Sequence, residues 1–290
     1  MHYNLFEWSN NSSVISPNPK SKDKTNIAKQ LELFFEILYA GKTPRINSDG
    51  VTSHEAATGG SFQTISGGSM GFPKVLERTC ISWILSFNTN DKNYNLSGSR
   101  VALLGSLTHS LSLYGALEAI FLGCEVHHLA GLSPGSQLEY LENKKIEILY
   151  VTPTQLRLML SAKYKNYLID GLRYIFIGGA SIEQNTLAEL SKIAPNAELK
   201  QFYGSSETSF ITISDLLTPI NSVGKAYPGV EIVLGDQPDK PVSVGETGRV
   251  WVRSPYLFSN YVGENRSNIN RFSDWVSPGE LAKLDLDQNL

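Results

Sequence analysis

The stretch TISGGSMGFPKVLERT, residues 64–79, carries three glycines, two serines, a proline and a lysine. A glycine-rich turn after a strand exposes backbone N–H groups that no side chain covers, and a lysine at its edge adds positive charge. Such a hollow favours a polyphosphate. The spacing is not that of the common P-loop, because Pro73 directly precedes Lys74 and neither serine nor threonine follows. On its glycines alone, the stretch is equally typical of a flexible surface turn.

A second stretch, QFYGSSETS at residues 201–209, delivers a tyrosine, a glycine turn, two hydroxyls and a carboxylate after a predicted strand. Sheets of α/β proteins bind ligands at the carboxyl ends of their strands. Tyr203 can stack on a base, a serine can donate to a phosphate, and Glu207 can hold Mg²⁺ through oxygen. The alternative is a plain turn with an exposed glutamate.

Other candidate residues have equally ordinary alternatives. The glycines of FIGGAS, residues 176–181, allow a flat ligand to approach, but a tight turn also requires them. His109 follows a strand and precedes an apolar helix, where a histidine more commonly hydrogen-bonds at the helix start. Glu280, Asp285 and Asp287 lie in turn-like sequence and are by default solvated loop charges.

Predicted strands and helices alternate along most of the chain. Residues 9–26 are predicted to be a loop or a poorly ordered arm, and a basic, helix-like run is expected after residues 64–79. Strands are predicted at 62–66, 100–106, 125–130, 148–152, 172–179 and 199–205, and helices at 27–40, 112–123, 136–145, 154–164 and 185–194. This alternation predicts an α/β fold with mostly parallel sheets flanked by helices.

The residue pattern changes after Tyr227. A smaller β-rich subdomain is predicted there by the segments GVEIVLG, GRVWVRSP and YLFSNYVG. We therefore expect three parts: a shortened N-terminal arm and helix at 1–60, an α/β nucleotide- and acyl-binding core at 61–226, and the β-rich subdomain at 227–290.

Composition narrows the class of protein. The 290 residues are 41% hydrophobic and 18% charged, and the net charge of −3 gives no argument for binding nucleic acid or an anionic membrane. Cys80 and Cys124 are too few for a disulfide framework and match no metal-ligand spacing, as expected of buried thiols in a reducing compartment. The N-terminus lacks a signal-peptide pattern, and no apolar run approaches the roughly 20 residues of a membrane span. We expect a cytoplasmic protein.

Taken together and in order, these motifs resemble those of the adenylate-forming (AMP-binding) superfamily, which includes acyl- and aryl-CoA synthetases, carrier-protein-charging adenylation domains and luciferases. The similarity spans residues 62–290 and implies the large N-terminal domain of the acyl-adenylate-forming fold. The matching segments are residues 66–74, 178–180, 203–207, 245–253 and 278–285.

The resemblance implies an AMP-forming ligase that converts a carboxylate and MgATP to acyl-AMP and pyrophosphate, then passes the acyl group to coenzyme A or a carrier-protein thiol. Because two anions must approach, their charge must be masked by Mg²⁺, backbone N–H groups and Lys74. By resemblance, Glu207 holds the metal, and Lys74, Glu207 and His109 have catalytic roles. The implied nucleotide-binding residues are Ser66, Gly67, Gly68, Ser69, Gly71, Lys74, Gly178, Gly179, Ala180, Tyr203, Gly204, Ser205, Ser206 and Glu280.

The acyl group is expected to contact His109, Tyr114, Gly178, Gly204 and Phe210. Residues 109–112 contain no carboxylate, which argues against an α-amino acid substrate, whose ammonium an aspartate would bind. A medium-sized or aryl acid and a fatty acid both remain open.

Several departures from the family pattern favour a second reading. Met70 and Gly67 replace hydroxyl residues of the phosphate loop, and Glu280 replaces an aspartate. The region before the loop is short, and the chain stops in LDLDQNL, before the hinge and the C-terminal domain that carries the family's catalytic lysine. We expect a fragment or truncated chain; loss of that domain is the alternative. A catalytically weak or inactive nucleotide-binding relative is the alternative function, and an unrelated phosphate-binding α/β protein is a third reading.

Overall fold

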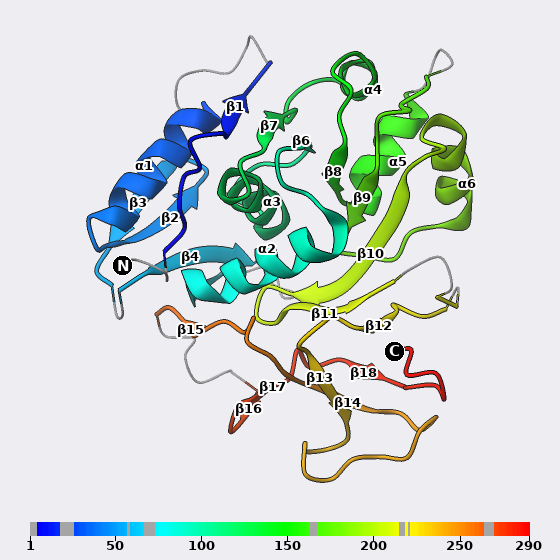
Figure 1. The fold of residues 1–290 in the computed structure, drawn as a ribbon. Coiled ribbons are helices and arrows are strands. Elements are labelled where there is room, and N and C mark those ends of the chain that lie inside the picture. Colours follow the sequence, from blue (N-terminus) through cyan, green and yellow to red (C-terminus); the bar gives the residue numbers. More distant parts are fainter. Residues whose placement is uncertain are drawn as a thin grey trace.

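The computed structural model describes residues 5–17, 26–56, 59–66, 73–162, 167–214, 218–219, 221–263 and 270–290. Its central feature is a large sheet with the strand order β1-β7-β6-β8-β9-β10-β11-β12 (Figure 1). Pairing is parallel from β1 to β10 and antiparallel for β11 and β12. The strands are β1 (Ser13–Ile15), β6 (Arg100–Leu103), β7 (Glu125–His128), β8 (Ile148–Val151), β9 (Tyr174–Ile177), β10 (Glu198–Ser205), β11 (Ser209–Ile213) and β12 (Lys225–Ala226).

Helices cover both faces of this sheet because its central strands are apolar on both sides. Successive side chains of a strand point to opposite faces. In β8, Ile148 and Tyr150 join the core cluster that contains α2 and α3, whereas Leu149 and Val151 join the cluster of α4, α5 and α6. The helices are α1 (Ile27–Tyr39), α2 (Cys80–Tyr94), α3 (Ser110–Phe121), α4 (Pro134–Asn143), α5 (Pro153–Ser161) and α6 (Gln184–Ile193).

A second sheet lies beyond α2 and α3, in the order β15-β5-β4-β2-β3. Its strands β4 and β5 form an antiparallel pair in which Ser66 is opposite Lys74, so the two ends of the glycine-rich segment are adjacent. Strand β15 comes from far along the chain and pairs with β5. The strands are β2 (Thr43–Asn47), β3 (Gly50–His54), β4 (Ser61–Ser66), β5 (Lys74–Thr79) and β15 (Asn260–Tyr261).

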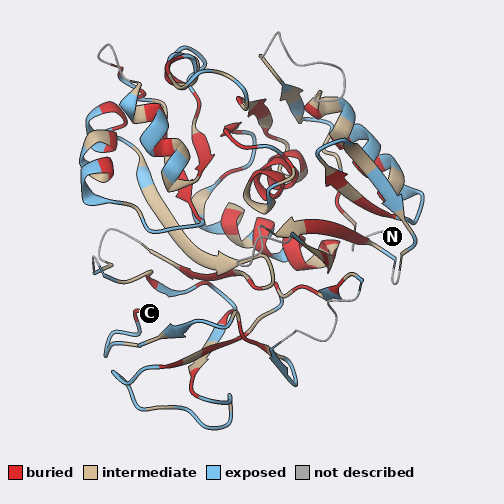
Figure 2. Cartoon of the chain, turned by 180° about the vertical axis from the view of Figure 1, so that it is seen from behind, coloured by how far each residue is buried: buried red, intermediate tan, exposed pale blue. Residues whose placement is uncertain are grey.

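A third, antiparallel sheet forms the lower part of the molecule in Figure 1. Buried residues concentrate around the central helices and strands, while this part shows more exposed chain (Figure 2). Its strands are β13 (Glu231–Leu234), β14 (Gly248–Arg253), β16 (Arg271–Phe272), β17 (Trp275–Val276) and β18 (Leu281–Ala282), in the order β13-β14-β17-β16 with β18 also on β14.

The predicted α/β class, with mostly parallel strands, flanking helices and a β-rich C-terminal region, is confirmed. The helix expected at 27–40 spans Ile27–Tyr39. The helix-like run expected after residue 79 is α2, which begins at Cys80. The segment 9–26, predicted to be a loop or arm, contains the short strand β1. Strand β5 was not predicted.

The proposed division at residues 60 and 226 stays a prediction. Pairing of β2 with β4 and of β15 with β5 connects strands across both boundaries. None of the helices that the structure describes is both long and apolar enough to cross a bilayer.

Candidate functional site

A cavity of about 390 Å³ opens where β8, β9 and β10 end. Thr152 follows β8, Gly178 follows β9, and Ser205 ends β10. This is the edge at which α/β sheets bind ligands. The cavity is lined by Arg78, Trp83, Ser110, Leu111, Tyr114, Thr152, Gly178, Gly179, Phe202, Gly204, Ser205, Ser206, Ser209 and Phe210.

Two of the predicted glycines are required by the close approach of their neighbours. A Cβ on Gly204 would lie 1.8 Å from the carbonyl oxygen of Ser209, because the register of β10 and β11 shifts at this point. A Cβ on Gly178 would lie 2.2 Å from the Phe202 ring. Both distances are far below van der Waals contact, so side chains here would displace the cavity wall.

Tyr203 and Glu280, 77 positions apart, meet at the surface. The Tyr203 hydroxyl donates a hydrogen bond to the Glu280 carboxylate. Burial, together with this carboxylate, raises the pKa of Tyr203 well above its usual value, so the phenol stays protonated and donates. Two residues assigned to the nucleotide by sequence are thus in contact.

Lys74 and Glu207 are brought together by a third residue, Tyr261 of β15. The Tyr261 hydroxyl donates to Oε1 of Glu207 at 2.7 Å, and Nζ of Lys74 lies 5.0 Å from the centre of the Tyr261 ring. Burial and the Glu207 carboxylate raise the pKa of Tyr261. The turn that carries Glu207 is ordered by Ser205, whose Oγ accepts from the backbone N–H groups of Glu207 at 3.2 Å and Thr208 at 3.3 Å.

A single carboxylate at this point fits magnesium bound mainly through a nucleotide. Mg²⁺ in such sites takes one or two protein carboxylates, with phosphates and water completing its coordination. Within the described residues, no cluster of three or more acidic, histidine or cysteine side chains forms a complete metal site, and no donor contacts Oε2 of Glu207. Glu207 therefore keeps one oxygen available for such a metal.

Arg78 is a site residue that the sequence analysis missed. Its fully buried guanidinium donates from Nη1 to the Tyr256 carbonyl at 2.8 Å and from Nη2 to the Ser206 carbonyl at 2.5 Å. It also lies over the Trp83 ring, 5.6 Å from its centre. Burial lowers the pKa of Arg78 to about 9, while the charge of Glu207 acts in the opposite direction. No local pattern in KVLERT marks Arg78, because its partners Ser206 and Tyr256 lie 128 and 178 positions away.

The predicted acyl-binding residues divide into two groups. Tyr114, Gly178, Gly204 and Phe210 line the cavity. His109 instead occupies the N-cap of α3, is exposed, and makes no side-chain capping bond; its neighbours Ser110 and Leu111 line the cavity.

The predicted nucleotide-binding residues also divide. Gly178, Gly179, Gly204, Ser205 and Ser206 line the cavity, whereas Ala180 is exposed beside it. Ser66 and Lys74 are opposite one another at the ends of β4 and β5. The remaining predictions, Gly67, Gly68, Ser69 and Gly71, together with Met70, lie outside the described residues.

The sequence pattern of the family described as AMP-binding enzyme matches residues 61–262. The chain is 31% identical over 219 residues to a putative long chain fatty acid-CoA ligase, VraA, of Staphylococcus epidermidis, covering 75% of this chain and 46% of that protein. It is 30% identical over 228 residues to an uncharacterized acyl-CoA ligase, YhfT, of Bacillus subtilis, covering 77% and 46%.

The fold is also similar to that of a solved structure. O-succinylbenzoate coenzyme A synthetase (MenE) from Bacillus subtilis, in complex with ATP and magnesium ion, matches with a TM-score of 0.69 and 20% identity over 79% of this chain and 48% of that one. The chain spans about half the length of the curated relatives it matches. Because the family pattern covers well over half of the sequence, the chain belongs to the AMP-binding enzyme family.

Proposed function

We propose that this chain carries the nucleotide- and acid-binding region of an AMP-forming carboxylate ligase, which makes an acyl-adenylate from MgATP and transfers the acyl group to the thiol of coenzyme A or of a carrier protein. The observation that carries the proposal is the contact of Lys74 and Glu207 with Tyr261, close to a cavity with aromatic walls. A cation and a metal-binding carboxylate beside an apolar pocket suit the joining of a carboxylate to a phosphate.

The residues have separate tasks in this reaction. One oxygen of the acid attacks the α-phosphorus of ATP, the bond to the pyrophosphate oxygen breaks, and pyrophosphate leaves with the electron pair. Lys74 neutralises phosphate charge, and Glu207 would hold Mg²⁺, which masks the charge of the triphosphate. In the second step a thiol loses its proton, its sulfur attacks the acyl carbon, and AMP leaves.

The proposed nucleotide site requires one contact to change. Tyr203 would lie against the adenine, and Glu280 would bind the ribose hydroxyls. The Glu280 carboxylate now accepts a hydrogen bond from the Tyr203 hydroxyl, which the ribose hydroxyls would replace. The hydroxyls of Ser110 and Ser206, 3.4 Å apart, lie at the cavity, where Ser206 is assigned to a phosphate.

The names of the relatives leave two classes of acid open. VraA is named for long-chain fatty acids and MenE for an aryl acid. Both are named as coenzyme A ligases, which favours coenzyme A as the acceptor. Use of ATP and coenzyme A also favours a cytoplasmic location.

The test is carboxylate-dependent exchange of labelled pyrophosphate into ATP by the full-length protein, together with calorimetric binding of MgATP. We expect exchange with at least one acid of a broad panel. Glu207→Gln should abolish the exchange, whereas Glu183→Gln, which alters an exposed carboxylate, should not. Binding without exchange would support the alternative prompted by Met70 and Glu280, a non-catalytic nucleotide-binding relative. Absence of binding would overturn both.

A further inference from the structure

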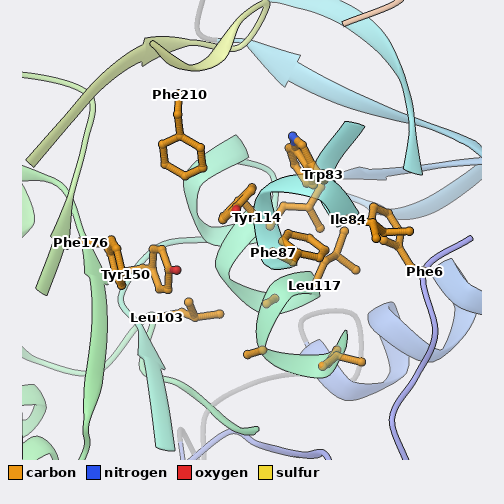
Figure 3. Packing of buried hydrophobic residues seen from close by; sticks show 14 of the residues in the cluster. Phe6, Trp83, Ile84, Phe87, Leu103, Tyr114, Leu117, Tyr150, Phe176 and Phe210 are labelled. Atoms are coloured by element: carbon orange, nitrogen blue, oxygen red, sulfur yellow. The ribbon is translucent and has the colours of Figure 1, made fainter. Parts of the chain in front are cut away.

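The inner wall of the cavity is a continuous layer of aromatic side chains. Trp83 from α2, Tyr114 from α3, Phe202 from β10 and Phe210 from β11 all line it. Their rings meet edge to face, with centres 5.2 Å apart for Trp83 and Tyr114, 5.1 Å for Tyr114 and Phe210, and 4.8 Å for Phe202 and Phe210. Figure 3 shows Trp83, Tyr114 and Phe210 around one space. The wall is therefore closed by ring contacts.

Tyr114 separates the cavity from buried aromatic side chains of the core. Phe87 packs against Tyr114 at 5.1 Å, and behind the ring Tyr150 stacks on Phe176 at 4.9 Å. Phe87, Leu117, Tyr150 and Phe176 are all buried (Figure 3). Because protein interiors are close-packed, an acyl chain cannot pass Tyr114 without displacing these side chains.

A buried polar network fixes the position of Tyr114. Its hydroxyl lies 2.9 Å from Oγ of Ser86 and 3.1 Å from Oε1 of Glu118. Glu118 is itself buried and accepts further hydrogen bonds from Asn90, at 2.8 Å, and from Tyr150. If the Tyr114 ring rotated away, a carboxyl group inside the core would lose a partner, which is costly.

From this wall we infer that the site takes a compact, flat aromatic carboxylic acid and excludes long-chain acids. Tyr114 is the specificity-determining residue, and Glu118 is a positioning residue that acts through it. The inference rests on the proposed function, which assigns the aromatic wall of this cavity to the acid and Ser206 on the same cavity to a phosphate. The cavity volume, about 390 Å³, is near the lower end of the roughly 300–1,000 Å³ of small-molecule sites, and the acid would share it with part of the nucleotide. Edge-to-face walls favour a flat ring.

The first experiment measures which acids the full-length protein binds. In the presence of MgATP, we expect benzoate and substituted benzoates to bind at least about tenfold more tightly than hexadecanoate, as measured by calorimetry and by pyrophosphate exchange. Tighter binding of hexadecanoate would overturn the inference. Failure to bind MgATP would remove the proposed function itself, whereas MgATP binding without a preference for aromatic acids would remove only this inference.

The second experiment opens the wall. Tyr114→Ala should weaken the binding of benzoate and strengthen the binding of octanoate and longer acids about tenfold. If Tyr114→Ala does not fold, Phe210→Leu opens the same wall from β11 and replaces it. An unchanged chain-length profile in the folded variant would contradict the role of the wall.

The third experiment tests Glu118 as a positioning residue. Glu118→Gln should raise the KM for the aromatic acid several-fold and leave kcat and the KM for ATP nearly unchanged. The matched control is Tyr140→Phe. Tyr140 lies on α4, outside the cavity lining, and its hydroxyl hydrogen-bonds to His127, so this variant should change neither KM nor kcat. A parallel fall in kcat, or the same rise in the control, would refute the assignment.

Discussion

Single side chains at this site act through neighbours distant in sequence. Lys74 and Glu207 stand in recognisable motifs, but the residue that joins them, Tyr261, comes 54 positions after Glu207. Its hydroxyl holds one oxygen of the carboxylate while its ring faces the lysine. Tyr261 therefore orients the proposed metal-binding oxygen without being a ligand itself, in the manner of outer-shell groups at other metal sites.

Tyr261→Phe removes that hydroxyl and keeps the ring. We expect the affinity for MgATP to fall about fivefold, on the order of 1 kcal/mol, because Glu207 loses a hydrogen bond that orients it. Titration calorimetry measures the change, and thermal unfolding should show a preserved fold. Tyr39→Phe, which removes a hydroxyl bonded to the Phe6 carbonyl, is the control and should leave the affinity intact. A gain in affinity would mean instead that the Tyr261 hydroxyl competes with the metal.

Helix α3 carries a buried carboxyl group, that of Glu118, into the hydrophobic core. Glu118 faces Tyr114 on its own helix, Asn90 on α2 and Tyr150 on β8, and Tyr227 bonds to Asn90. Burial raises the pKa of Glu118 to about 7, although the hydrogen bonds from Tyr150, Asn90 and Tyr114 lower it. The nearby charge of Asp91 also raises it, and the buried tyrosines keep their protons because burial raises their pKa values.

The raised pKa of Glu118 makes the stability of the fold depend on pH. Because this pKa is higher in the folded state than the ordinary value of 4.5, the stabilising contribution of protonated Glu118 is complete below pH 4.5. That contribution is lost as the pH rises through about 7. The free energy of unfolding should fall by about 3 kcal/mol across this window, and Glu118→Gln should remove that part of the slope. Urea unfolding at several pH values measures it. The exposed-site variant Glu183→Gln should retain the wild-type slope, and identical slopes in all three proteins would contradict the prediction.

The sequence predicted elements well where apolar residues repeat regularly and poorly where polar residues face inward. The bounds of α2 were not predicted because Ser82, Ser86 and Asn90 are buried on it. The two serine hydroxyls donate to backbone carbonyls of the preceding turn. Strand β5 was not predicted because its six residues do not alternate: Val75 and Leu76 are adjacent, and so are Glu77 and Arg78.

The site was predictable only where its residues are contiguous. The segments containing Gly178 and Tyr203 could be found from their glycines and hydroxyls. Arg78, Trp83 and Tyr261 could not, because each acquires its role from partners more than 50 positions away, and such pairings follow from topology rather than local pattern.

In the whole molecule, Arg78 connects parts of the chain that are far apart in the sequence. From β5 it binds the carbonyls of Ser206 and Tyr256, which are 128 and 178 positions away. It therefore joins the second sheet, the turn after β10 and the segment after β14. A buried cation without a carboxylate in direct contact depends on these carbonyls for its stability.

Arg78→Met keeps the length of the side chain but removes the donors. We expect a loss of about 2–4 kcal/mol in the free energy of unfolding, because two carbonyls in the interior lose their hydrogen bonds. Chemical denaturation measures it. Arg157→Met, at an exposed ion pair with Glu183, should cost less than about 1 kcal/mol. Equal losses in the two variants would show that the Arg78 contacts do not hold the parts together.

The pairing of β15 with β5 has a mechanical consequence. Tyr261 is in register with Leu76, two positions from Lys74, so the segment leading to the third sheet is attached to the strand that carries the lysine. The backbone position of Lys74 is therefore coupled through these hydrogen bonds to the segment that leads into the third sheet, although the two lie more than 180 positions apart in the sequence.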